Sequence, residues 1–144
     1  MKRLGALLML CACSNGVGAG SPTPFLGKWR VTGNGTLSTD MGPDPFSGSV
    51  PTEKFNLVFA KGGASDLESI DNYGCRINWS VNGNAASLVV PQRLTCYGVI
   101  DVETGSLQLT PVDADHLSGS GMVSGQCGDK PCSADAAGTF TKVP

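Results

Sequence analysis

The chain has 144 residues, of which 20 are Gly and 9 are Pro, with 15% charged residues and a formal net charge of −2. This size and composition predict one globular domain with many turns and exclude a disordered chain. The basic residues of the body are scattered singly, so no positive face for a phosphate backbone is expected and nucleic acid is not an expected partner.

The amino-terminal segment has the layout of a signal peptide. A positive start, Met1-Lys2-Arg3, is followed by a run from Leu4 to Ala12 that is uncharged and mostly apolar. This run of about nine residues is less than half of the length that a helix needs to cross a bilayer. We therefore expect residues 1–12 to be cleaved and not to span a membrane.

The end of this run, Leu10-Cys11-Ala12-Cys13, resembles the lipobox of bacterial lipoproteins, with Cys11 where Ser, Ala or Thr is usual. The resemblance implies that Cys13 becomes the first mature residue and carries a diacylglyceryl lipid, with palmitate as a typical acyl chain. Two acyl chains are sufficient for stable membrane attachment. Residues 13–24 then form a flexible Gly/Ser/Pro tether.

Ser14, which follows the lipidated cysteine, resembles lipoproteins sorted to the outer membrane, so the expected location is the cell envelope. The alternative is a secreted or periplasmic protein cleaved after Gly20, because Gly18 and Gly20 are small residues at the required spacing.

The body, residues 25–144, is predicted to be a single all-β domain. Short alternating segments are separated by Gly, Asn, Asp and Pro, and hardly any helical periodicity occurs. About seven or eight strands predict a single antiparallel barrel or a sandwich. The expected strands are 28–32, 54–60, 75–81, 84–90, 92–102, 106–111, 116–124 and 138–143. Residues 67–70 fit either a short strand or one helical turn.

The body opens with Gly27-Lys28-Trp29, which resembles the Gly-x-Trp opening of lipocalin-like β-barrels. The resemblance implies a barrel, and one interpretation of this barrel is a carrier of a small apolar ligand. A second lipocalin motif of the Thr-Asp-Tyr type and a helix after the last strand are not found in the sequence. The alternative is that Trp29 plugs one end of a small barrel of any kind.

Residues 40–52, rich in Gly and Pro, are expected to form a long loop between the first two strands. Long loops on rigid β scaffolds often carry binding surfaces. Met41 and Phe46 are apolar in polar surroundings, so this loop is predicted to close a barrel mouth or to meet a partner. The alternative is a loop with Phe46 folded back onto the core.

The segment from Cys75 to Val81 alternates between apolar and polar residues and is followed by Asn82-Gly83, a strong hairpin signal. With these two residues at the centre of the turn, Trp79 is expected opposite Ala86.

Outside the signal peptide and Cys13, the chain has four cysteines: Cys75, Cys96, Cys127 and Cys132. An even number in an exported protein predicts disulfides, with three possible connectivities. We favour Cys75 with Cys96 and Cys127 with Cys132. A zinc site is the alternative, but the long gap between Cys75 and Cys96 does not match its usual ligand spacing.

Two polar groups are candidates for chemistry. Asp113, Asp115 and His116 fit a divalent cation site or an acid and base pair, and their alternative is a polar turn in which Asp caps its own backbone. Asp101 and Glu103 fit an acid pair or a solvated rim. No Gly-x-Ser-x-Gly elbow is present. We therefore assign no catalytic residue, cofactor site or metal site from the sequence.

The leading hypothesis is a non-enzymatic, membrane-anchored lipoprotein whose disulfide-stapled β-domain binds a protein or an envelope component. The alternative is a lipocalin-like carrier of a small apolar ligand, which requires a cavity inside the barrel. The second alternative is an enzyme that uses the Asp113, Asp115 and His116 group.

Overall fold

The computed structural model describes residues 20–39, 42–50, 56–95 and 98–144. The expected signal peptide, Cys13 and Cys96 lie outside these residues. Within them the chain forms one short 3-10 turn, η1 (Thr23–Phe25), and ten strands. The strands are β1 (Gly27–Thr39), β2 (Gly42–Val50), β3 (Asn56–Lys61), β4 (Leu67–Ile70), β5 (Arg76–Asn82), β6 (Ala85–Leu88), β7 (Gln92–Leu94), β8 (Ile100–Pro111), β9 (His116–Cys127) and β10 (Lys130–Val143).

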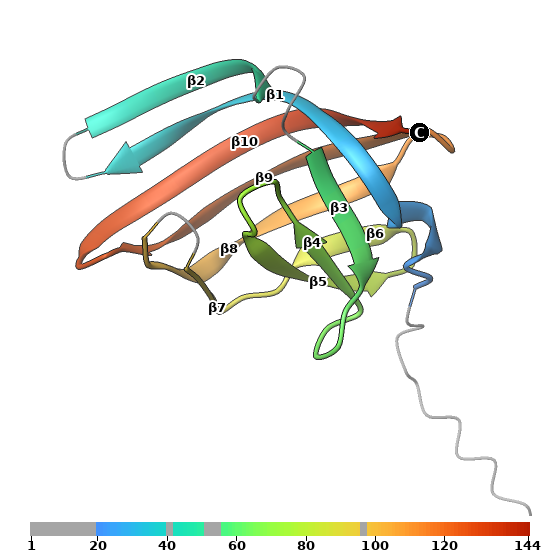
Figure 1. The fold of residues 1–144 in the computed structure, drawn as a ribbon. Coiled ribbons are helices and arrows are strands. Elements are labelled where there is room, and N and C mark those ends of the chain that lie inside the picture. The colour runs from blue at the N-terminus through green and yellow to red at the C-terminus, as the bar shows by residue number, and fades with distance from the viewer. Residues whose placement is uncertain (1–19, 40–41, 51–55, 96–97) are drawn as a thin grey trace, which may run out of the picture.

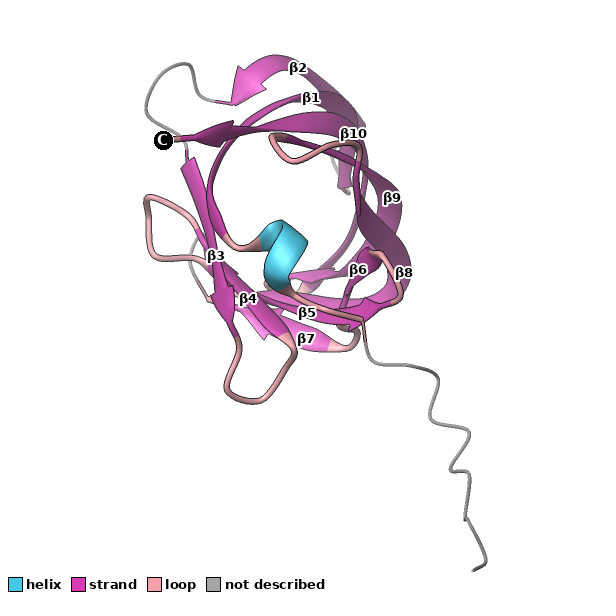
Figure 2. Ribbon diagram, turned by 90° about the vertical axis from the view of Figure 1, so that its right-hand side faces the viewer, coloured by secondary structure: helices cyan, strands magenta, loops and turns pink. Residues whose placement is uncertain are grey.

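Eight of the described strands close into an antiparallel barrel in the order β1-β3-β4-β5-β6-β8-β9-β10, and the pairing of β10 with β1 completes the ring. Viewed along the barrel, the strands surround η1 (Figure 2). Two further strands lie outside the ring, β2 against β1 and β7 against β8. The all-β prediction is confirmed. Of the two expected architectures, barrel and sandwich, the structure has the barrel, whose closure pairs the edge strands that a sandwich leaves open.

The ring is made of strands of two lengths. β3 to β6 have 4 to 7 residues, whereas β1, β8, β9 and β10 have 12 to 14. The long strands therefore extend past the short ones and carry β2 and β7 on their extensions (Figure 1).

A tight apolar core fills one end of the barrel. Phe25, Trp29 and Leu117 are completely buried there, and the Phe59 and Trp79 rings lie 5.9 Å apart in a tilted contact. Such aromatic contacts add to the stabilisation that comes from burial alone. The core therefore lies at the end where η1 enters the ring.

Two expected elements differ from the observed ones. Most of the expected loop 40–52 is strand β2, which pairs with β1 from Val31↔Val50 to Thr39↔Gly42. Its prolines, which donate no hydrogen bond, are tolerated because β2 pairs on one side only among the described residues. The expected single strand 92–102 is divided between β7 and the start of β8. Residues 67–70 form a strand and not a helical turn.

The β5–β6 hairpin is present, but its register is shifted. Val81 pairs with Ala86 and Trp79 with Leu88, so the turn is centred on Gly83 and Asn84 and not on Asn82 and Gly83. The shift moves each partner by two positions, which leaves every side chain on its expected face. The face of the sheet on which each side chain lies was therefore predicted correctly, but the residue that it pairs with across the hairpin was not.

No helix within the described part of the chain is long and apolar enough to cross a bilayer.

Candidate functional site

The inner face of β1, β10 and β9 is lined by very small residues beyond the packed end. Gly33 pairs with Gly138, and Gly138 pairs with Gly119, so three glycines form a row across three strands. A Cβ atom at Gly119 would lie 2.6 Å from Leu109 Cδ2 and 2.9 Å from Phe140 Cε2. A larger residue at Gly119 would have to displace these two side chains, and all three glycines line a cavity inside the ring.

This space is an apolar cavity of about 190 Å³. Residues of six strands surround it, on opposite sides of the ring, so it lies inside the barrel. We call it the inner pocket, and its larger apolar side chains are Val31, Leu57, Ile77, Trp79, Leu107, Leu109 and Phe140. The indole N–H of Trp79, the one polar group of these seven side chains, donates to Ser69 Oγ at 2.9 Å, so it offers the cavity no free donor. The inner pocket therefore suits an apolar molecule.

A second apolar cavity of about 200 Å³ lies further along the long strands. We call it the disulfide pocket, and it is lined by residues that include Leu94, Ile100, Val102, Val123, Ala134, Cys127 and Cys132. It lies between β7 and the far ends of β8, β9 and β10.

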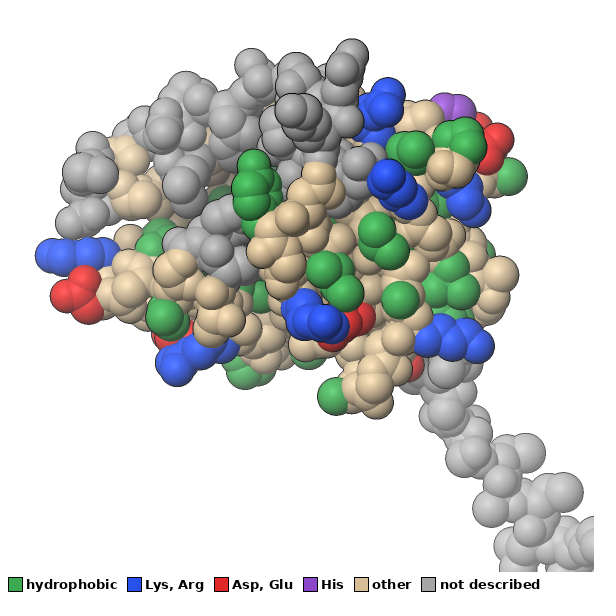
Figure 3. Space-filling model, viewed as in Figure 1, with side chains coloured by type: hydrophobic (Ala, Val, Ile, Leu, Met, Phe, Trp, Pro, Cys, Tyr) green, Lys and Arg blue, Asp and Glu red, His purple; other side chains and the backbone are tan. Residues whose placement is uncertain are grey.

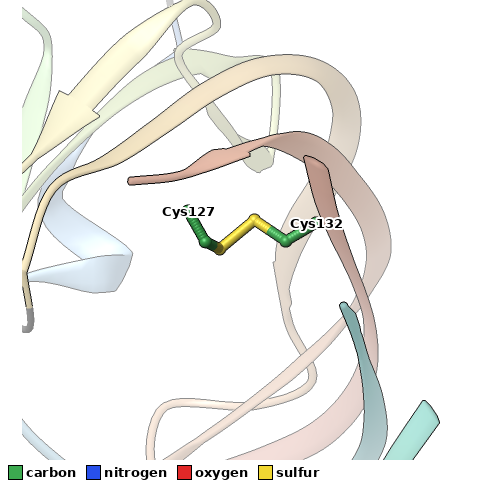
Figure 4. The surroundings of a disulfide bond; sticks show 2 residues. All are labelled: Cys127 and Cys132. Carbon is green, nitrogen blue, oxygen red and sulfur yellow. A yellow bond between two sulfur atoms is a disulfide. The ribbon is translucent and has the colours of Figure 1, made fainter. Parts of the chain in front are cut away.

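The Cys127–Cys132 disulfide joins the two arms of the β9–β10 hairpin, with Cα atoms 5.7 Å apart (Figure 4). This confirms the predicted pair. Cys75 is also disulfide-bonded. Its predicted partner, Cys96, lies outside the described residues, so that pairing stays a prediction.

Trp29 of the Gly-x-Trp segment closes the packed end of the barrel. Its indole N–H donates to the Phe25 carbonyl oxygen at 2.7 Å, which ties β1 to η1. Lys142 Nζ lies 5.3 Å from the ring centroid, close enough for a cation–π contact. Trp29 therefore acts as a plug and does not line the inner pocket.

Asp113, Asp115 and His116 are close together, but in an exposed turn between β8 and β9. The Asp115 N–H donates to Asp113 Oδ1 at 2.8 Å, and His116 Nδ1 lies 2.8 Å from the same oxygen. The hydrogen bonds from Asp115 and His116 lower the pKa of Asp113. This is the self-capping polar turn, and the described residues contain no cluster of three or more potential metal ligands.

Asp101 and Glu103 do not form an acid pair. A β-bulge between Val102 and Thr104 interrupts the alternation at Glu103. The Arg93 guanidinium binds both carboxylate oxygens of Asp101, at 2.6 and 2.9 Å. This pairing lowers the pKa of Asp101, opposite to the rise that an acid catalyst requires.

The outer surface of the same strands is polar. A depression of about 530 Å³ crosses β1, β10 and β9. We call it the outer depression, and its side chains are Thr32, Asn34, Ser118, Ser120, Ala137 and Thr139. On the face shown in Figure 3, Lys and Arg side chains are spread singly, and several of them lie beside an Asp or Glu.

The inner pocket was not assigned from the sequence, although a signal for it exists. In residues 117–125, LSGSGMVSG, the inward positions carry Gly119, Gly121, Val123 and Gly125. Small residues at alternate positions of a long strand indicate either close backbone approach or empty space. Only the strand order decides which of the two applies.

No protein-family model and no curated protein matches the chain. Among solved structures, the chain is similar to EF1p2_mFAP2b bound to DFHBI, with 12% sequence identity and a TM-score of 0.44. The similarity covers 87% of this chain and 98% of that chain. This likeness concerns the fold alone.

Proposed function

We propose that the barrel binds a small apolar molecule in the inner pocket. The observation that carries this proposal is a cavity of about 190 Å³, surrounded by six strands and lined almost entirely by apolar side chains. Small-molecule sites of proteins are usually preformed and mostly apolar, with volumes of about 300 to 1,000 Å³, so this cavity alone suits a ligand smaller than most. Apolar surface of a ligand that leaves water here gains about 25 cal/mol per Å².

The lipobox supports a location for this binding protein. We propose that Cys13 carries the lipid and tethers the barrel to a membrane of the cell envelope, with the outer membrane favoured by Ser14. The proposed role is ligand binding without catalysis. The exposed turn at Asp113 has no part in this binding.

A second candidate is the binding of an envelope component or a protein at the outer depression. Its support is the lining of hydroxyl and amide side chains without a charged residue, which suits a neutral polar partner such as a polysaccharide. The two candidates use opposite faces of β10.

Two neighbouring alanines of β10 separate the candidates. Both residues border the inner pocket, but Ala136 takes the inward position of the strand, whereas Ala137 takes the outward position, is exposed and also lines the outer depression. In the Cys13→Ser chain, which takes no lipid and needs no detergent, we expect the fluorescence of the apolar dye N-phenyl-1-naphthylamine to rise on binding. Ala136→Phe fills the inner pocket and should weaken dye binding at least tenfold, while Ala137→Phe should leave it unchanged.

Equal dye binding by the parent chain and Ala136→Phe, or no dye binding by the parent chain, would contradict the inner pocket as the ligand site. Co-sedimentation with isolated envelope polysaccharide tests the second candidate in the same variants. Loss of sedimentation in Ala137→Phe alone would support the outer depression.

A further inference from the structure

The inner pocket and the disulfide pocket follow one another along the barrel. On β10, Ala136 lines the first and Ala134 lines the second, and these are successive inward positions. Inward positions on a strand are about 6.8 Å apart. The two cavities are therefore direct neighbours along this wall.

Two other walls, β8 and β9, have no side chain at the junction. On β9, the inward position between Gly119 and Val123 is Gly121, which pairs with Leu107 and Ala136. On β8, the inward position after Leu107 is Gly105, which pairs with Val123. At both glycines the backbone of the neighbouring strand, at Ser106 and at Met122, takes the place that a Cβ atom would occupy, so these two walls of the described barrel carry backbone and no side chain at the junction.

End to end, the two cavities extend along β10. From Gly138 at the inner pocket to Cys132 at the disulfide pocket there are six residues of β10, or about 20 Å of strand. The cavities hold about 190 and 200 Å³. Because C–C bonds of about 1.5 Å zigzag in an extended chain, each carbon advances by about 1.3 Å, so about sixteen carbons cover this length.

The polar groups lie at one end of this space. Arg93 and Asp101 form an exposed ion pair, and Asp101 borders the disulfide pocket. The opposite end is the packed core around Trp29 and Phe25. A molecule that occupies both cavities thus has an apolar tail toward the core and a polar end near Arg93.

We propose that the ligand is a single unbranched acyl chain of about sixteen carbons that lies across both pockets, with its head group beside Arg93 and Asp101. This inference rests on the proposed ligand binding in the inner pocket. A free fatty acid and a single-chain phospholipid share this chemistry and differ in the head group.

The test is displacement of N-phenyl-1-naphthylamine from the Cys13→Ser chain by octanoic, dodecanoic and hexadecanoic acids and by the lysophosphatidylcholine with a sixteen-carbon chain. A longer acyl chain is more hydrophobic and therefore binds any apolar site more tightly. A rise in affinity with chain length thus does not by itself show that the chain occupies both pockets. The decisive comparison is Ala134→Phe, which fills the disulfide pocket and leaves the inner pocket intact. We expect this variant to bind hexadecanoic acid at least tenfold more weakly and to bind the dye and octanoic acid as before.

Asp135→Phe places the same side chain at the adjacent outward position and should leave all affinities unchanged. Ala134→Leu gives an intermediate loss, and dye binding by each variant confirms that its barrel is folded. An unchanged affinity of Ala134→Phe for hexadecanoic acid, together with normal dye binding, overturns the two-pocket inference and leaves the proposed function standing. Absence of dye and acid binding in the parent chain overturns both. A preference for the lysophospholipid over hexadecanoic acid identifies the membrane lipid as the source of the chain.

Discussion

Among single residues, Asp113 shows how a candidate site in the sequence becomes a structural turn. Its carboxylate accepts hydrogen bonds from the Asp115 backbone and approaches His116, and these contacts lower its pKa below the ordinary value of 3.8. The spacing of the three polar residues was visible in the sequence. Their exposure was not, because it depends on where β8 ends and β9 begins.

The lowered pKa makes a prediction about acid stability. A carboxyl with a lower pKa in the folded chain contributes stability at neutral pH, and this contribution is lost as the pH falls below 3.8 through the folded-state pKa. Asp113→Asn keeps an acceptor oxygen for the Asp115 N–H but cannot ionise. We expect its melting temperature to fall less steeply with pH in this range than that of the parent chain. Asp129→Asn removes one charge from the β9–β10 turn and serves as the control. Parallel melting curves for the parent chain and Asp113→Asn would show that the carboxylate contributes nothing.

At the level of elements, the strands with strict alternation were the most predictable. Alternation from Cys75 to Val81 identified the buried face of β5 correctly, since the period of two depends on local sequence alone. The register was wrong because Asn82-Gly83 and Gly83-Asn84 are both acceptable turn centres. β2 was missed because its prolines suggest a loop until its position at the edge of the sheet is known.

The observed turn predicts a specific effect of one glycine. Gly83 has φ = +60°, and a Cβ atom there would meet nothing within 4 Å. Gly83→Ala is therefore strained by the backbone alone and should cost about 1 kcal/mol of folding stability. The expected change in melting temperature is a decrease of about 3 °C. Gly63 also has open space but no positive φ, so Gly63→Ala is the matched control and should be neutral or slightly stabilising. If both variants melt at the same temperature, Gly83 does not have the positive φ on which this prediction rests.

At the level of the whole molecule, the sequence was sufficient for the fold class but not for the pocket. Trp29, Phe59 and Trp79 suggest a solid core, and they do fill one end. The empty part depends on Gly33, Gly138 and Gly119 lying side by side, although they are far apart in the chain. Their meeting is a property of strand order and register, which local patterns do not determine.

The packed end of the barrel is also where the chain enters. The Gly20 N–H donates to the Val81 carbonyl oxygen at 3.2 Å, and η1 follows directly, so residues 20–24 of the expected tether contact the barrel. The seven residues from Cys13 to Gly20 span at most about 25 Å. If Cys13 carries the lipid, the packed end faces the membrane and the disulfide pocket points away from it.

The anchor itself is tested by two cysteines of the same segment. Cys13→Ser removes the thiol that the lipid requires, so the protein should move from the membrane fraction to the soluble fraction of the envelope. Cys11→Ser restores a residue that is common at this position of a lipobox and should leave the protein in the membrane fraction. Fractionation followed by immunoblotting measures both. Membrane retention of Cys13→Ser would contradict the proposed lipid anchor and the orientation that follows from it. Dye binding in the inner pocket depends on neither cysteine.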